Sequence, residues 1–291
     1  MRIRLLGMLL RIFSWISPRH AKTIAAPLAS SIWRLSRRKR DVTRRNLEVA
    51  YPGIDPHQRD QLAIASLVHY IHSILEAGML WHWPATKIMT SLEDVRGLKH
   101  LHAARAGGRG VIIAGPHWGS WELISTFIQK EIDGAILFKP SKHADFEREL
   151  LQKRLRTGVD YAPTTAAGLK RIYRHLKAGR AVGYVCDQEP SAGMGRWVPF
   201  FGIPALTPVL IPRLIQKTAC RVVFSVAERR KDGRYRVHFL PVDEAIYSTD
   251  IDTSLTALNL GIEACIAIDP EQYLWAYKRF RHGPDYTKGI Y

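Results

Sequence analysis

The sequence has few cysteines and few acidic residues. Only three of its 291 residues are cysteine, at positions 186, 220 and 265, and they are widely spaced within apolar segments. This spacing gives neither a disulfide framework nor a cluster of metal ligands, and it predicts reduced core residues in a protein that faces the cytosol. Acidic residues number 26 against 43 lysines and arginines, which leaves a formal net charge of +17. An excess of positive charge this large favours a polyanionic partner.

Several common catalytic signatures are also missing. The sequence has no Walker loop, no dinucleotide-binding glycine motif, no histidine-rich metal signature and no Gly-x-Ser-x-Gly elbow. The common nucleotide-dependent enzymes and serine hydrolases therefore lack support. His69 and His72 are three residues apart on a predicted helix, but no third ligand follows at a recognisable spacing, so we interpret them as polar-face residues. We expect neither a metal nor a cofactor.

Basic residues are concentrated at the beginning of the chain. Residues 1–45 contain twelve lysines and arginines and a single acid, Asp41, so 12 − 1 = +11 of the net charge lies in this segment. Four of these basic residues are consecutive, at positions 37–40. Charge of one sign beside apolar sequence is typical of a segment that meets an anionic surface.

The first apolar runs are too short to make a convincing bilayer span. Residues 3–16 predict an apolar helix with a narrow polar stripe, and a second apolar piece, residues 24–35, is interrupted by Pro27. Spanning a bilayer takes roughly 20 apolar residues, and the first run also contains Arg11. We therefore favour a helix that lies on an anionic membrane surface, with residues 37–40 against the headgroups. A single spanning helix and a buried N-terminal helix are the alternatives.

From residue 96 onward the hydrophobic pattern alternates between helices and strands. Strands are predicted at residues 111–113, 135–138, 181–186, 221–226 and, with the alternation of an edge strand, 235–240. Strands separated by helical crossovers predict an α/β fold, a mostly parallel sheet flanked by helices. We expect residues 41–291 to form one domain of this kind, preceded by a membrane-associated helical segment over residues 1–40. Ligands of such sheets bind beyond the carboxyl ends of the strands, where His117 and Asp187 lie.

The stretch VIIAGPHWGSWELIST, residues 111–126, holds the main candidate site. Its first residues predict a buried strand, Gly115 and Pro116 end that strand, and Glu122 opens an apolar helix with Gly119 as its N-cap. This bend would place the imidazole of His117 beside the carboxylate of Glu122. The pair is either a base with an orienting acid or a loop histidine beside an ordinary capping glutamate.

Four ordered motifs resemble the lipid A biosynthesis late acyltransferases, the lauroyl and myristoyl transferase family. RGVII at residues 109–113 with HWGSWE at 117–122 resembles its first block, and Asp187-Gln188 with VPFFGIPA at 198–205 is similar to its second. The C-terminal signature of the family is matched by YLW, KRF and Pro284 within residues 273–284. Its N-terminal signature is matched by RRNL with Tyr-Pro within residues 44–52. The resemblance runs from about residue 40 to the end of the chain.

This resemblance implies an activity, partners and a location. The family moves a fatty acyl group from acyl carrier protein to a hydroxyl of a phosphorylated lipid A precursor, on the cytoplasmic face of the bacterial inner membrane. Its fold is an α/β acyltransferase fold like that of the glycerol-phosphate acyltransferases. We expect a monomer that binds no nucleic acid. The positive charge then has a use, because both the carrier protein and the acceptor are anionic.

The chemistry of such a transfer, together with the resemblance, leads us to expect roles for particular residues. His117 takes the proton of the acceptor hydroxyl, and Glu122 holds and polarises the imidazole. Backbone N–H groups at the start of the Glu122 helix stabilise the oxyanion. The anionic parts of the substrates are assigned to cationic side chains, namely Lys139, Arg154, Arg156 and Arg279. Asp187 positions substrate or a basic side chain, or else simply caps a strand end.

Two other functions stay open at this point. The first is an acyltransferase for another membrane lipid, such as a mannosylated phosphoinositide or a glycerol phosphate. The second is a nucleic-acid-binding protein that uses the net charge of +17. The basic residues gather beside apolar helices and no nucleic-acid recognition motif accompanies them, which counts against the second alternative.

Overall fold

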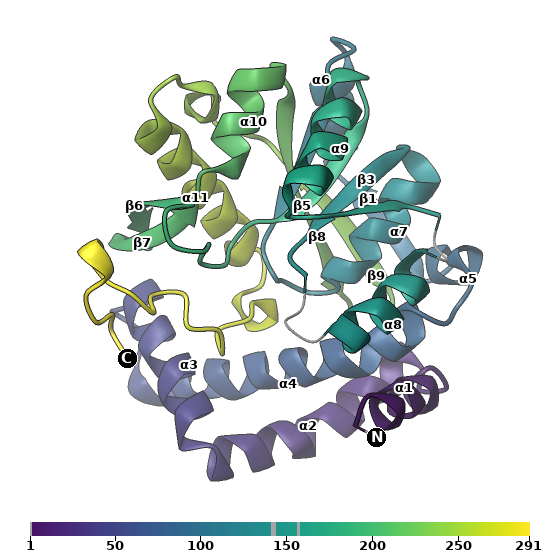
Figure 1. Ribbon diagram of the computed structural model, residues 1–291. Coiled ribbons are helices and arrows are strands. Elements are labelled where there is room, and N and C mark those ends of the chain that lie inside the picture. The colour runs from purple at the N-terminus through teal and green to yellow at the C-terminus, as the bar shows by residue number, and fades with distance from the viewer. Residues whose placement is uncertain (1, 141–143, 156–157) are drawn as a thin grey trace.

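The computed structural model describes residues 2–140, 144–155 and 158–291, and it is built around a seven-stranded sheet with helices on both faces (Figure 1). The strands are β1 (Leu92–Arg96), β2 (Val111–Gly115), β3 (Gly134–Phe138), β4 (Asp160–Pro163), β5 (Ala181–Val185), β8 (Arg221–Arg229) and β9 (Tyr235–Leu240), with a separate hairpin of β6 (Gly195–Phe200) and β7 (Ile203–Pro208). The helices are α1 (Arg2–Phe13), α2 (Pro18–Leu35), α3 (Arg37–Ala50), α4 (Pro56–Leu80), α5 (Ala85–Met89), α6 (Leu98–Arg105), α7 (Trp121–Glu131), α8 (Ala144–Leu155), α9 (Ala166–Lys177), α10 (Leu210–Thr218) and α11 (Ile251–Ala267).

The strands lie in the order β1-β9-β8-β2-β5-β3-β4. β2 pairs in parallel with β5 and β8, and β3 pairs in parallel with β4 and β5. Only β9 and β1 run the other way, because β9 is antiparallel to β8 and parallel to β1. The predicted α/β fold with a mostly parallel sheet is therefore confirmed. Since β2 and β5 are neighbours, the loops that follow their carboxyl ends lie side by side.

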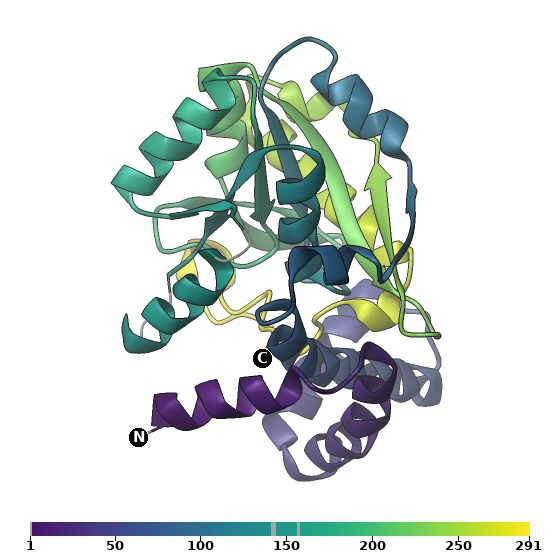
Figure 2. The ribbon, with the colours of Figure 1, turned by 90° about the vertical axis from the view of Figure 1, so that its right-hand side faces the viewer.

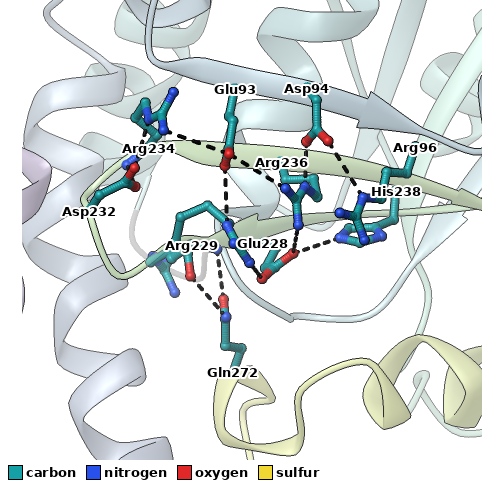
Figure 3. A network of polar contacts seen from close by, with 11 residues as sticks. Glu93, Asp94, Arg96, Glu228, Arg229, Asp232, Arg234, Arg236, His238 and Gln272 are labelled. Atoms are coloured by element: carbon teal, nitrogen blue, oxygen red, sulfur yellow. Dashed lines mark hydrogen bonds and ion pairs between the residues drawn. The ribbon is translucent and has the colours of Figure 1, made fainter.

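The edge position predicted for residues 235–240 is wrong, because β1 lies outside β9. The sequence of β1, LEDVR, is too polar to predict a strand from its hydrophobic pattern. Its acids contact basic residues of the neighbouring strand (Figure 3). The guanidinium of Arg236 bonds to Asp94 and lies 3.5 Å from Glu93 and 3.8 Å from Glu228 on β8. Cross-strand ion pairs of this kind stabilise the pairing of a polar edge strand, which has few apolar side chains to bury.

The first four helices pack together under the sheet domain (Figure 1). α4 begins at the N-cap Asp55, whose carboxylate accepts bonds from the backbone N–H groups of His57 and Gln58. Among the described residues α4 is the one helix long and apolar enough to cross a membrane, and 61% of its most apolar stretch is buried within the protein. α2 continues through Pro27, so the predicted interruption there is wrong. The expected boundary between residues 40 and 41 falls inside α3.

A buried ion pair joins α4 to the sheet. The Glu76 carboxylate accepts bonds of 3.0 and 2.7 Å from the guanidinium of Arg229 on β8, and one of 2.6 Å from the Tyr235 hydroxyl on β9. About two turns and one turn before Glu76 on the same helix, His69 and His72 are 6% and 4% exposed. They are buried side chains at the packing surface of α4, and the interpretation as polar-face residues is wrong. Hydrophobic neighbours on both sides of α4 explain this, since the helix is covered on most of its circumference.

The C-terminal segment ties distant parts of the chain together. The side-chain amide of Asn46 on α3 donates bonds of 2.7 Å to the carbonyls of Trp275 and Tyr277. The Tyr277 hydroxyl accepts a bond of 3.1 Å from the backbone N–H of Glu189, in the loop after β5. The loop that follows β5 is thus held from outside the sheet.

Candidate active site

A short loop after β2 presents His117 at the carboxyl edge of the sheet. β2 ends at Gly115, and α7 begins at Trp121 with Ser120 as its N-cap, one residue later than the sequence predicted. Gly119 has a φ of +53°, and a Cβ at this position would lie 2.1 Å from the carbonyl oxygen of Ala227. Only glycine fits such a close approach with a left-handed backbone. The turn therefore holds the imidazole beyond the strand end and starts the helix immediately afterwards.

The imidazole of His117 is held by Asp187. Its Nδ1 lies 2.6 Å from Oδ1 of Asp187, and the backbone N–H of His117 donates a 3.1 Å bond to Oδ2 of the same carboxylate. The Asp187 side chain is 2% exposed, whereas that of His117 is 22% exposed. A carboxylate at Nδ1 places the proton on that nitrogen and leaves the lone pair on Nε2. The ring of Trp121 packs edge-on against the imidazole, with 5.4 Å between the ring centres.

Asp187 is ionised although it is deeply buried. Burial would raise the pKa of Asp187, but the charge of His117, the two hydrogen bonds from His117 and the more distant charge of Arg279 together hold the pKa of Asp187 below its usual value. Burial and the nearby carboxylate raise the pKa of Tyr273 well above its usual value, so its hydroxyl stays protonated beside Asp187. A fixed negative charge therefore lies beside Nδ1 of the imidazole.

Glu122 contacts Arg154 and not the imidazole. Its carboxylate forms an ion pair with the guanidinium of Arg154 on α8 and accepts a 3.2 Å bond from the indole N–H of Trp81, just after α4. The guanidinium also lies 5.7 Å from the ring centre of Trp81 and 5.6 Å from that of Tyr161 on β4. Glu122 and Arg154 are only 15% and 16% exposed. A bidentate pair between two rings holds Arg154 rigidly at this position.

These contacts differ in part from those expected from the sequence. The carboxylate beside the imidazole was expected to be that of Glu122, and in the structure it is that of Asp187. Asp187 was expected to position substrate or a basic side chain, or to cap a strand end, and it contacts the basic side chain of His117. The reason is topological: β2 and β5 are paired in parallel along their whole length, so His117 and Asp187 follow strands that end side by side. Arg279 does not meet the expected substrate anions. It is 2% exposed and donates to the carbonyl of Leu206 and the hydroxyl of Thr207.

A cavity of about 620 Å³ opens beside His117, within the usual range for ligand sites of about 300–1,000 Å³. Much of its wall is apolar, with aliphatic side chains from β2, β3, α9 and the start of α10, among them Ile113, Ile136, Leu137, Leu169, Val209 and Leu210. Glu122 and Arg154 also line it. Such a space suits a long apolar chain whose reactive end reaches the imidazole.

The remaining expected residues and several unexpected ones can be placed around this cavity. Lys139 follows β3 and lines the cavity with an exposed side chain, whereas Arg156 lies outside the described residues. Trp81, Tyr161 and Arg213 contact or line the site and were not identified from the sequence. No local pattern marks these residues, because each comes from an element that only the tertiary fold brings near His117.

The arrangement can perform general-base chemistry. An imidazole whose Nδ1 is held by an ionised carboxylate can take a proton at Nε2. Cys186, Cys220 and Cys265 are buried core residues, so none of these thiols is placed to attack a ligand in the cavity. Burial raises the pKa of all three thiols, which disfavours the nucleophilic thiolate.

Comparisons with known proteins agree with this geometry. A family model described as bacterial lipid A biosynthesis acyltransferase matches residues 4–282. The lipid A biosynthesis lauroyltransferase of Escherichia coli K12 is 26% identical over 255 residues, which cover 87% of this chain and 82% of the relative. The lipid A biosynthesis palmitoleoyltransferase of the same organism is 27% identical over 257 residues, covering 88% and 83%. A lipid A biosynthesis acyltransferase of Haemophilus influenzae is 26% identical over 259 residues, covering 87% and 80%. This chain belongs to the family of bacterial lipid A biosynthesis acyltransferases.

Proposed function

We propose that this protein transfers a fatty acyl chain from acyl carrier protein to a hydroxyl of a lipid A precursor, in lipopolysaccharide biosynthesis. One observation carries the proposal: His117, oriented by a buried carboxylate, lines a partly apolar cavity large enough for an acyl chain. The family membership supplies the reaction class. The alternative acceptors, a mannosylated phosphoinositide or a glycerol phosphate, would need the same base and the same apolar cavity.

The proposed reaction is direct transfer. Nε2 of His117 removes the proton of the acceptor hydroxyl while its oxygen attacks the thioester carbon. The C–O bond forms, and the carbonyl becomes a tetrahedral oxyanion. Collapse of the oxyanion breaks the C–S bond, and the imidazolium returns the proton to the departing thiolate. Asp187 stabilises the imidazolium between these steps without taking the proton. General-base help of this kind is typically worth about 10²- to 10⁴-fold in rate.

The cationic residues at the cavity are proposed to bind the anionic groups of the substrates. Arg154 is held by Glu122 in a position where its guanidinium lines the cavity, and Lys139 lines it from the loop after β3. Arginine matches a phosphate with two parallel hydrogen bonds, while lysine acts as a point charge. We assign Glu122 a positioning role through Arg154, in place of direct contact with His117.

The N-terminal helices are proposed to lie on the cytoplasmic face of the inner membrane. Large apolar side chains are exposed along α1, the loop after it and α2, namely Met8, Ile12, Trp15, Ile24 and Leu28. Exposed apolar residues at helical spacing, beside the basic residues of the same segment, are typical of interfacial helices. α1 lies under α8, the helix that carries Arg154 (Figure 2). A membrane-bound acceptor would thus enter near the cavity.

The test is transfer by the purified protein. Acyl carrier protein with acyl chains of different length is incubated with a lipid A precursor, and the product is identified by mass spectrometry. We expect the precursor to gain one acyl chain through an ester bond. The variant His117→Ala should give no product, although its circular dichroism spectrum should match that of the wild type. Acylation of a phosphoinositide or a glycerol phosphate and not of the precursor would refute the proposed acceptor. Full activity of the variant would refute the proposed base.

A further inference from the structure

The oxyanion of the proposed reaction requires hydrogen-bond donors, and the loop that carries His117 has few to offer. The backbone N–H of His117 is bound by Asp187, and that of Trp118 by the carbonyl of Pro116. The N–H groups of Gly119 and Ser120 are bound by the carbonyls of Gln272 and Ala227. Four consecutive donors before α7 are therefore engaged within the protein. The backbone source expected from the sequence is thus limited to the first N–H groups of α7, at Trp121 and Glu122. A side-chain donor close to Nε2 of His117 would add to them.

Gln188 lies in a suitable place. Its side-chain Nε2 is 3.4 Å from Nε2 of His117, the nitrogen that takes the proton, and the residue lines the cavity. At 3.4 Å this contact is too long to be a strong hydrogen bond, so the amide is not committed to the imidazole. Consecutive residues thus contact the two ring nitrogens, Asp187 at Nδ1 and Gln188 at Nε2. The Asp187 bonds also fix the backbone that carries Gln188.

The position relative to the reacting atoms follows from chemistry. The acceptor oxygen must lie about 3 Å from Nε2 of His117 to give up its proton, and the thioester carbon is one forming bond beyond it. The carbonyl oxygen on that carbon therefore develops its charge within a few ångströms of the Gln188 amide. An amide has two N–H donors and no charge, so it can bind this oxygen without disturbing the neutral imidazole.

We propose that Gln188 is a catalytic residue whose side-chain amide donates a hydrogen bond to the thioester carbonyl oxygen as it becomes the oxyanion. This inference rests on the proposed acyl transfer. Removal of one oxyanion donor in other enzymes costs about 10²- to 10³-fold in kcat. We expect a loss of that size in Gln188→Ala and in the near-isosteric Gln188→Glu, which has the same length but presents a carboxylate to the developing negative charge. The KM for the acyl donor should change little.

The decisive experiment compares two unreactive acyl carrier protein conjugates. One carries a tetrahedral phosphonate, which imitates the oxyanion, and the other carries an alkyl thioether of the same length without the carbonyl oxygen. We expect Gln188→Ala to weaken binding of the phosphonate by about the factor lost in kcat/KM and to leave thioether binding unchanged, because the interaction is specific to the transition state. The pH dependence of kcat should keep its midpoint, since the base is unaltered.

A matched control and the contrary results complete the test. Gln216→Ala removes an exposed amide on α10 that donates to the carbonyl of Thr249, and it should keep wild-type kinetics. Equal weakening of both conjugates by Gln188→Ala, or a kcat within about threefold of wild type, would overturn the assignment of Gln188. A shifted midpoint of the pH profile would show instead that Gln188 acts only on His117. Absence of acyl transfer in the wild-type protein would refute the proposed function itself.

Discussion

Nδ1 of His117 and Oδ1 of Asp187 lie 2.6 Å apart, although 70 positions separate the two residues in the chain. The distance is short because β2 and β5 pair in parallel, so that both residues follow strand ends on the same edge of the sheet. Glu122, only five positions from His117, forms its ion pair with Arg154 instead. Proximity in the sequence is therefore a poorer guide to the partner of the imidazole than strand pairing.

Arg154→Lys should weaken binding of the phosphorylated acceptor. Lysine keeps the charge but loses the bidentate contact to Glu122 and the stacking on Trp81. A hydrogen bond to a charged group is worth about 1.5–3 kcal/mol, so KM for the acceptor should rise by about 10- to 100-fold with a smaller change in kcat. Steady-state kinetics with varied acceptor measure this. Arg174→Lys on α9 is the control, and an unchanged KM in Arg154→Lys would exclude the substrate role.

Glu76→Gln should strongly destabilise the fold. It leaves the buried guanidinium of Arg229 without its counter-charge, and breaking a buried pair in this way costs about 3–5 kcal/mol. Urea denaturation followed by circular dichroism measures the free energy of unfolding. Asp41→Asn, which breaks an exposed pair with Arg37, should leave that free energy unchanged within error. Similar small effects of both variants would mean that the α4 contact does not hold the N-terminal helices to the sheet.

Stability should fall in mild acid because of the two buried histidines. Burial, followed by the charge of Arg229, lowers the pKa of His69 to about 2 and that of His72 to about 4. In the unfolded chain both rings titrate near 6.5, so between pH 6.5 and 4 the unfolded state binds more protons and is favoured. Each histidine then removes about 1.4 kcal/mol of stability per pH unit below 6.5. Stability from these groups is retained above pH 6.5.

The measurement is the free energy of unfolding between pH 7.5 and 4.5 for the wild type and for His72→Leu. Leucine cannot take up a proton, so the slope with pH should be shallower in the variant, whatever its absolute stability. Parallel slopes would show that His72 titrates alike in the folded and unfolded states, and hence that it is not buried as the structure describes.

Trp15→Ser should weaken binding to lipid vesicles. The Trp15 side chain is 81% exposed in the loop after α1, among other exposed apolar residues. Moving such a side chain from water into the interface is worth about 1.5–3 kcal/mol, so the partition coefficient on vesicles with anionic lipid should fall by about 10- to 100-fold. Tyr173→Ser, which removes an exposed aromatic ring from α9, should have no effect. Equal binding by both variants would place the membrane contact elsewhere.

The sequence predicted the sheet well wherever burial dictates the residue pattern. Apolar runs in the sequence predicted strands where the structure has β2, β5 and the first part of β8. These runs are apolar because both faces of the strands are covered. In this sheet, β1 and β4 were missed. Each of the two is short and partly polar, and β1 depends on ion pairs with β9 that no local pattern reveals. The β6–β7 hairpin was missed as well.

The candidate site was predicted as a set of residues more successfully than as a set of contacts. His117, Glu122, Arg154, Asp187 and Lys139 all lie at or around one cavity. Strand pairing decides which carboxylate contacts the imidazole of His117. The burial of Arg279 depends on the β6–β7 hairpin that packs over it. Contacts between side chains from distant elements are decided by the tertiary fold, and for these residues the sequence alone supported only a list of candidates.

The most direct test of the account compares Asp187→Asn with Glu122→Gln in the acyl transfer assay, with the concentration of each substrate varied up to saturation. An amide at position 187 cannot stabilise the imidazolium, and the same change in a serine protease lowers kcat by about 10⁴-fold. We expect a loss of about 10³- to 10⁴-fold in kcat for Asp187→Asn. Glu122→Gln should lose far less in kcat and mainly raise KM for the acceptor. The reverse order, with Glu122→Gln abolishing turnover and Asp187→Asn close to wild type, would contradict the assignment of Asp187 as the partner of His117.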